Sequence, residues 1–291
     1  GIPRRRPACG ARDARHANPR GRCRRRPERR LGPRGDADCR LVGATVAGGR
    51  LDQPGSGRAL YDLTEATVGD VTLDCADGFD RYRFYQTRFD GFPFAAYRRF
   101  LRVSGWRIHE YAGTPATETT TEGLELTYLA ARQGATDAGD GENAAAFLVR
   151  ELRYRRRRYA AHARDPAHGL GHRVDAALRW LTNGFLDAVA GYGERPQRVV
   201  AVSLATIVGG ALLYPATGGL TAGSRVVTYA SDGPLAAVDG LYFSVVTFAT
   251  LGLGDVHPAG TAARLVAASE ALAGAFLTAL FVFALGRRVS R

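Results

Sequence analysis

The sequence contains no lysine and no methionine, so all 40 of its Lys/Arg residues are arginine. Because a chain without methionine has no initiator residue, we expect that residue 1 is not the biological start. Only four cysteines occur among 291 residues, at Cys9, Cys23, Cys39 and Cys75. They show no CxxC spacing, which argues against a zinc site, and their number and scatter do not support a disulfide framework.

Motifs that carry catalysis are also missing. The sequence has no nucleophile elbow, no paired carboxylate site and no Gly-rich dinucleotide fingerprint in a strand–helix context. The six histidines are scattered, and the closest spacing of interest, His168 and His172, is flanked by glycines rather than set on a helix face. We therefore expect a protein that is not an enzyme and that holds no cofactor.

Positive charge is concentrated at one end of the chain. Residues 1–40 contain 14 of the 40 arginines and 4 of the 28 acidic residues, so the rest of the chain is almost neutral. This segment has almost no large apolar residue and cannot bury enough surface to offset its ordering entropy. We predict a disordered Arg-rich tail over residues 1–40, with anionic lipid or nucleic acid as alternative ligands. The absence of interleaved aromatics argues against nucleic acid as a partner.

Residues 41–97 contain a short repeat, in which apolar residues recur five positions apart in three blocks. Neither a helix nor an ordinary strand has this period, whereas a small coil refilled every five residues does. The positions are Leu41, Val46 and Leu51; Leu63, Val68 and Leu73; and Phe79, Phe84, Phe89 and Phe94. Here the sequence resembles the pentapeptide-repeat family, which implies a right-handed, square-sectioned β-helix with a scaffold role. Short strands in an ordinary α+β domain are the alternative.

Residues 98–197 are predicted to be a linker followed by cytoplasmic helices. The apolar spacing predicts one helix near residues 124–133, ended by Gly134, and a second over 142–163, packed together as a helical hairpin. An amphipathic helix is expected over residues 174–190. The RYRRRRY run at 153–159 is either a solvated face or a contact for anionic headgroups below a membrane.

Residues 198–291 are predicted to be an all-α domain with two membrane spans. The first apolar segment, 199–214, is shorter than the ~20 residues that a span needs, so a buried core helix is the alternative for this segment alone. The second, 262–285, is longer. Between them lie a loop and a short re-entrant helix over 234–249, which Asp232 or Ser231 would cap.

The loop after the short helix reads Thr250-Leu251-Gly252-Leu253-Gly254-Asp255 and suits a dehydrated cation. A K⁺ ion that sheds its water needs a ring of oxygens, which backbone carbonyls from four copies of one loop can supply. Pointing successive carbonyls toward one axis requires left-handed dihedrals, which Gly252 and Gly254 permit. The two leucines would point backward and pack the loop against its helix. We predict that permeant K⁺ is held by the backbone of Thr250, Leu251, Gly252 and Leu253.

With this loop, the sequence resembles the two-transmembrane potassium-channel pore family over about residues 198–288. The resemblance also rests on the aromatic pair Tyr242-Phe243 on the short helix, on His257-Pro258 after the loop, and on Gly274 midway along the second span. It implies a selectivity filter at residues 250–255 and a gating hinge at Gly274, for which close helix packing is the alternative explanation.

One filter position departs from the family's TVGYGD pattern in a way that matters. Leu253 stands where the family has a tyrosine that hydrogen-bonds behind the filter and fixes its width. A GLG filter does occur among potassium channels with two pore domains per chain, so K⁺ conduction is still expected. Selectivity over Na⁺ is the property that this departure puts in question.

Arginines lie just before the first span and just after the second span in the sequence. Only Arg225 lies between the spans before the filter. The positive-inside rule then places both termini in the cytoplasm and the filter on the outer side of the cell membrane. Glu270 would lie inside the bundle, with a group of a neighbouring subunit as a candidate partner. Phe281 and Phe283 would form a hydrophobic constriction at the inner mouth.

The sequence thus predicts a multidomain membrane protein that acts as a potassium-selective channel and assembles as a homotetramer in a lipid bilayer. The repeat domain would offer a surface for a cytoplasmic partner. Two alternatives stay open. One is a membrane-anchored pentapeptide-repeat scaffold with a non-conducting pore, and the other is a non-selective cation channel.

Overall fold

The computed structural model describes residues 22–25, 37–54, 57–75, 78–111 and 119–289. The chain divides into two compact units, Gly1–Asn183 and Gly184–Arg291. Most of the Arg-rich tail, residues 1–21 and 26–36, lies outside the described residues. The structured chain nevertheless begins before the expected boundary at residue 40, because residues 22–25 and 37–40 are strands.

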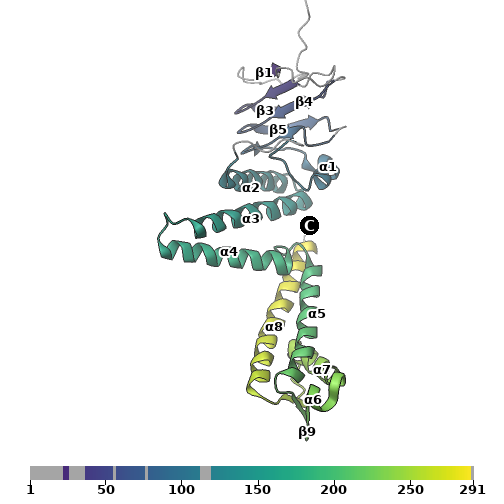
Figure 1. Cartoon of the computed structure of the whole chain (residues 1–291). Coiled ribbons are helices and arrows are strands. Elements are labelled where there is room, and N and C mark those ends of the chain that lie inside the picture. The colour runs from purple at the N-terminus through teal and green to yellow at the C-terminus, as the bar shows by residue number, and fades with distance from the viewer. Residues whose placement is uncertain (1–21, 26–36, 55–56, 76–77, 112–118, 290–291) are drawn as a thin grey trace, which may run out of the picture. The chain divides into compact units, whose positions relative to one another are not determined.

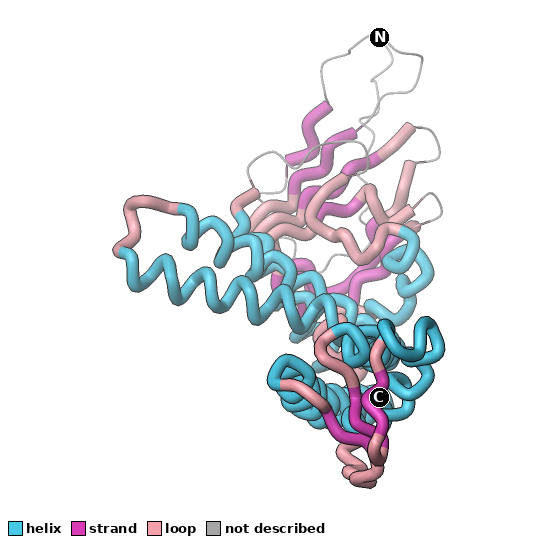
Figure 2. Tube along the Cα trace, turned by 60° about the horizontal axis from the view of Figure 1, so that its bottom comes forward, coloured by secondary structure: helices cyan, strands magenta, loops and turns pink. Residues whose placement is uncertain are grey.

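The first unit begins with two sheets whose parallel strands alternate along the chain (Figure 1). One sheet has the order β1-β2-β4-β6, in which only β1 is antiparallel, and the other has the order β3-β5-β7. The strands are β1 (Arg22–Arg25), β2 (Ala37–Arg40), β3 (Thr45–Leu51), β4 (Ala59–Asp62), β5 (Thr67–Leu73), β6 (Tyr82–Arg83) and β7 (Arg88–Phe89). The chain therefore winds in successive coils that give one strand to each sheet, and Figure 2 shows these strands stacked.

The residues that recur five apart stack between coils. Val46 pairs with Val68, and Val68 pairs with Phe89, while Leu51 pairs with Leu73 in the same sheet. All ten repeat positions are buried in one core except Leu41, which is partly buried against it. Successive coils are offset by 22 and then 21 residues, as the pairs Thr45–Thr67 and Thr67–Arg88 show. Each coil is thus slightly longer than a coil with four sides of five residues each would be.

A helical hairpin covers the last coil and shares its core. It consists of α2 (Thr121–Asp137) and α3 (Gly141–Arg164), preceded by a 3-10 turn (Phe94–Tyr97) and α1 (Arg98–Val103). The ring of Phe147 on α3 packs edge-on against Phe94, with centroids 5.0 Å apart. Buried carboxylates join the two helices, since Arg132 pairs with Glu151 at 2.7 Å and Arg155 with Glu125 at 2.8 Å. Part of the RYRRRRY run therefore faces α2 rather than solvent or lipid.

The expected end of the first helix at Gly134 is wrong. Gly134 lies inside α2, which continues to Asp137. A Cβ at this position would lie 2.5 Å from the Cβ of Phe89, so the absence of a side chain lets the helix approach the last coil. Glycine here serves packing between elements rather than helix termination.

His109 supplies a pH dependence to the first unit. Its imidazole is buried, with Nδ1 2.8 Å from the hydroxyl of Tyr128, and burial lowers the pKa of His109 from 6.5 to about 4. The unfolded chain then binds more protons below pH 6.5, so stability falls as pH falls from 6.5 toward 4. We expect the free energy of unfolding to drop by about 2 kcal/mol between pH 7 and pH 5. Urea unfolding followed by Trp106 fluorescence in a Trp180→Phe background measures this loss. His109→Gln should remove most of it, and an unchanged pH slope in that variant would contradict the assignment.

The second unit contains two long apolar helices, α5 (Pro196–Leu213) and α8 (Thr261–Val289). Two segments, Pro196–Ala216 and Thr261–Arg288, are long and apolar enough to cross a membrane. Between them lie the shorter elements: a 3-10 turn (Tyr214–Ala216), β8 (Leu220–Ala222), β9 (Arg225–Val227), α6 (Tyr229–Asp232), a 3-10 turn (Gly233–Leu235), α7 (Ala236–Phe248) and β10 (Val256–Pro258). α7 packs against both α5 and α8, which also contact each other. The expectation of an all-α domain is wrong, because β8, β9 and β10 form a three-stranded sheet. Since β10 pairs with β8, the segment after α7 is held at both ends. α4 (Leu170–Ala190) connects the two units in sequence.

Candidate functional site

The loop predicted to bind cations begins directly at the end of α7. The amides of Thr250 and Leu251 donate to the carbonyls of Thr247 and Val246, at 3.0 and 2.9 Å, so the last turn of the helix anchors the loop. Thr250, Gly252 and Gly254 have positive φ angles of 54°, 60° and 78°. Left-handed residues thus occur at every second position, which is the backbone pattern that turns successive carbonyls toward the same side.

Leu251 and Leu253 do not pack the loop against its own helix, contrary to expectation. Each is 61% exposed in the single chain. The contact with α7 is made by backbone hydrogen bonds from the first loop residues, and these leave both leucine side chains outside the core of the unit. Two large apolar side chains on an exposed loop are a surface that another chain can cover.

A side-chain hydrogen bond braces the far end of the loop. The hydroxyl of Tyr242, on α7, donates to the Asp255 carboxylate at 2.7 Å. The sequence singled out both residues but gave no reason to pair them. This contact ties the middle of α7 to the end of the loop.

A buried carboxylate on α8 joins α7 to the end of the first span. Glu270 on α8 is 4% exposed and accepts hydrogen bonds from the hydroxyls of Tyr214, at the end of the first span, and Ser244, on α7. The ring of Phe243 packs edge-on against Tyr214, with centroids 4.8 Å apart. Glu270, for which a neighbouring subunit was the expected partner, therefore has two hydrogen-bond partners within its own chain.

Three glycines allow the helices to approach this closely. A Cβ on Gly240 would lie 2.2 Å from the carbonyl oxygen of Ala211, and one on Gly274 would lie 2.2 Å from that of Phe248. A Cβ on Gly210 would lie 2.8 Å from both carboxylate oxygens of Glu270. Small residues at helix crossings are the usual means of close packing between membrane helices. Gly274 thus has a packing role at the end of α7, beside the hinge role that the resemblance implies.

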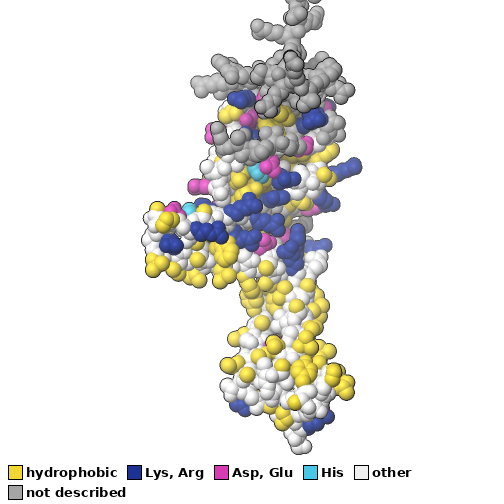
Figure 3. All heavy atoms as spheres, in the orientation of Figure 1, with side chains coloured by type: hydrophobic (Ala, Val, Ile, Leu, Met, Phe, Trp, Pro, Cys, Tyr) yellow, Lys and Arg dark blue, Asp and Glu magenta, His cyan; other side chains and the backbone are white. Residues whose placement is uncertain are grey.

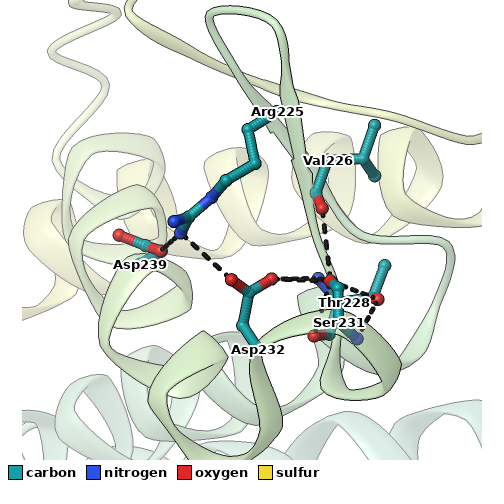
Figure 4. Close-up of polar contacts among 6 residues, drawn as sticks. All are labelled: Arg225, Val226, Thr228, Ser231, Asp232 and Asp239. Atoms are coloured by element: carbon teal, nitrogen blue, oxygen red, sulfur yellow. Dashed lines mark hydrogen bonds and ion pairs between the residues drawn. The ribbon is translucent and has the colours of Figure 1, made fainter.

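The segment between the first span and α7 is fixed by a polar cluster (Figure 4). Arg225 lies between two carboxylates, with Nη2 3.4 Å from Asp232 and 3.1 Å from Asp239. Thr228 and Ser231 form a capping box at the start of α6. Asp232 accepts a hydrogen bond from Ser231 that lowers its pKa. The predicted capping of α7 by Asp232 or Ser231 is wrong, because both side chains are used in this cluster.

The other end of α8 is tied to the segment before the first span. Phe281 packs with a small cluster that includes Val189 and Val199. Phe283 lies under the Arg287 guanidinium, which also pairs with Glu194 at 3.1 Å. The two phenylalanines thus have partners within the chain, and the inner constriction expected from them stays a prediction.

A comparison with protein-family models decides what kind of domain this is. Residues 201–291 match the family model described as "Ion channel". The C-terminal part of the chain is an ion channel domain. Together with the two apolar helices, the match indicates a membrane protein of the transport type. A search of curated proteins finds no match to the chain.

The ion channel domain places the predicted site residues in two groups. Residues 250–255 follow α7 and are hydrogen-bonded to Tyr242 in the middle of that helix, whereas Phe243 and Gly274 lie where α7 packs on its neighbours. No group of His, Cys, Asp and Glu side chains in the described part of the chain is arranged to hold a metal ion.

Sequence reasoning missed Tyr214, Ser244, Gly210 and Gly240. Their only signal was that small or polar residues occurred within apolar helices. The signal for Glu270 was stronger, since a lone carboxylate in an apolar segment must find partners.

Proposed function

We propose that residues 198–291 form one quarter of a potassium-selective pore, a homotetramer in which the loop 250–254 is the selectivity filter. The observation that carries the proposal is the left-handed backbone at Thr250, Gly252 and Gly254, directly after a helix whose C-terminal end faces the loop. Four such loops around one axis would supply the carbonyl rings that replace the water shell of K⁺. The partly negative end of α7 would favour a cation there.

The exposed leucines support assembly from several copies. The described part of their own chain leaves Leu251 and Leu253 open to solvent, and Leu265 and Leu272 on α8 are at least as exposed. A filter strand from one chain cannot surround an ion, so the site is incomplete without partner copies. Native mass spectrometry of the detergent-solubilised protein should give a mass of four chains. A monomer or dimer under conditions that preserve flux would contradict the proposal.

Cation flux from liposomes tests the proposed function. Vesicles that contain the full chain should release K⁺ much faster than Na⁺, and Ba²⁺ should block the flux because it binds where K⁺ binds. Equal and Ba²⁺-insensitive fluxes would favour the non-selective channel. No flux, even after removal of residues 1–190, would favour the scaffold.

Tyr242 is expected to compensate for Leu253 in setting the filter width. Because its hydroxyl is held by Asp255 at 2.7 Å, Tyr242→Phe should lower the K⁺/Na⁺ flux ratio without abolishing K⁺ flux. Asp255→Asn should do the same. The double variant should be no worse than either single variant, since one contact is removed in each case. Additive losses would show that the two residues act independently.

We also propose that the stacked coils of the first unit are a pentapeptide-repeat β-helix. The columns Val46–Val68–Phe89 and Leu51–Leu73 support it, because they bring residues of the five-residue period into register. With both termini in the cytoplasm of a cell-membrane protein, this unit would lie on the cytoplasmic side and offer its surface to a cytoplasmic partner. Protease added to the outside of intact cells should leave this unit uncleaved. Cleavage of the unit under these conditions would show that it lies on the outer side of the membrane.

A further inference from the structure

Helix α4 has an apolar side that the described chain leaves largely uncovered. Five large apolar residues recur along it at intervals of four, four, three and four, which places them on one side of a helix with 3.6 residues per turn. They range from 48% exposed at Phe185 to 75% exposed at Leu170. The set, called here the α4 apolar face, is Leu170, Val174, Leu178, Leu181 and Phe185. Figure 3 shows hydrophobic side chains gathered along this helix.

The opposite side of the same helix is polar. His172, Asp175 and Arg179 lie there and are exposed, and Arg179 pairs with Asp175 at 2.8 Å. A helix that is apolar along one side and charged along the other, without a core to cover the apolar side, is typical of a helix lying in a membrane surface.

The C-terminal end of α4 leads directly to the apolar helices of the ion channel domain. Its last residues, Val189 and Ala190, pack with Val199 on α5 and Leu277 on α8. The last member of the α4 apolar face, Phe185, contacts the ring of Phe276 on α8 at 6.0 Å between centroids. The apolar face is therefore continuous with the surface of a helix that can cross a membrane.

Trp180 lies at the edge between the two sides of α4. Its side chain is 44% exposed, which leaves the indole ring open on one side. Tryptophan is enriched at the boundary between hydrocarbon and water, because its ring is apolar and its N–H is polar. Its place beside the apolar face fits that boundary.

We propose that α4 lies along the surface of the bilayer, with the α4 apolar face buried among the lipid headgroups and the first acyl carbons. The expected depth is about 5–10 Å below the surface. The inference rests on α5 and α8 spanning the bilayer, as in the proposed function, but not on K⁺ selectivity. A second copy of the chain covering the same face is the competing occupant.

Depth-dependent quenching of tryptophan fluorescence tests the proposal. The full chain is reconstituted in phosphatidylcholine–phosphatidylglycerol vesicles, with Trp106 and Trp180 replaced by Phe and one tryptophan introduced at a time. Leu181→Trp probes the apolar face and Arg179→Trp, two residues earlier, is the matched control on the polar side. Leu204→Trp, at an exposed position in the middle of α5, reports whether the span itself is inserted.

Lipids brominated on the acyl chain should strongly quench the tryptophan emission of Leu181→Trp and change its emission wavelength little. Aqueous iodide should quench Arg179→Trp instead. Strong iodide quenching at both positions would place α4 in water and overturn the proposal. Protection of Leu181→Trp from both quenchers would mean that protein covers the face, which also overturns it.

Two further readouts keep these outcomes separable. If brominated lipid fails to quench Leu204→Trp, the spans are not inserted and the proposed function fails with the inference. If it quenches Leu204→Trp but not Leu181→Trp, only the α4 proposal fails. Native Trp180, measured in a Trp106→Phe variant, gives the same test without an introduced tryptophan and should show intermediate quenching by lipid.

Discussion

Gly252→Ala is expected to reduce K⁺ flux from liposomes to the level of empty vesicles. Gly252 has φ of 60°, a conformation that costs a residue with a Cβ about 1–2 kcal/mol. Because four loops would form one filter, the cost is repeated four times around the same ion path. The alanine would adopt a different dihedral, and the carbonyl of that position would turn away from the axis.

Gly223→Ala is the matched control for this variant. Gly223 lies between β8 and β9, has the same φ of 60°, and has the same open space where a Cβ would lie. It should therefore cost similar backbone strain without touching the loop that follows α7, and K⁺ flux should persist. Equal flux from Gly252→Ala and the parent protein would show that ions do not pass this loop. Equal loss from both variants would assign the effect to folding.

Gly274→Ala is expected to destabilise the ion channel domain strongly. Its Cβ would meet the backbone oxygen of Phe248 at 2.2 Å, and a backbone atom cannot move aside as a flexible side chain can. Overpacking of this kind costs about 1–3 kcal/mol, and separating α8 from α7 also disturbs the helix that leads into the proposed filter. Thermal unfolding in detergent, followed by helical circular dichroism, should show a lower midpoint.

Gly286→Ala is the matched control, because it is the same substitution in the same helix at a position with no neighbouring helix backbone close to the added Cβ. Apart from the adjacent backbone of its own helix, no described atom lies within 4 Å of a Cβ there. The gain in helix propensity, up to about 1 kcal/mol, should therefore raise the midpoint or leave it unchanged. Opposite signs for the two variants would support packing as the role of Gly274. An unchanged midpoint for Gly274→Ala, with reduced channel opening, would instead support the hinge.

The repeat in the first unit could be predicted from sequence because its period is local. Val46, Val68 and Phe89 are marked by spacing within their own blocks, and the structure places them in register. The 21–22-residue offset between coils could not be predicted, since it depends on where extra residues enter each coil. The helical hairpin was itself predicted, but its packing on the last coil was not, because contacts such as Phe94–Phe147 join segments far apart in the sequence.

The conformation of the loop at residues 250–254 could be predicted for a similar reason. Gly252 and Gly254 indicate their conformation directly, whereas the supports of the loop depend on how three helices cross. Glu270 was recognised as a buried charge, but its partners Tyr214 and Ser244 become visible only when α5, α7 and α8 are packed. The exposed side chains of Leu251 and Leu253 were missed because sequence reasoning assumed a single chain could complete the loop's packing.

The most direct test of a potassium-selective pore is the reversal potential of the reconstituted channel in a planar bilayer, with KCl on one side and an equal concentration of NaCl on the other. A selective filter predicts a reversal potential displaced far from zero, toward the value that opposes K⁺ movement. A reversal potential at zero, with current still carried and blocked by Ba²⁺, would contradict selectivity at this filter.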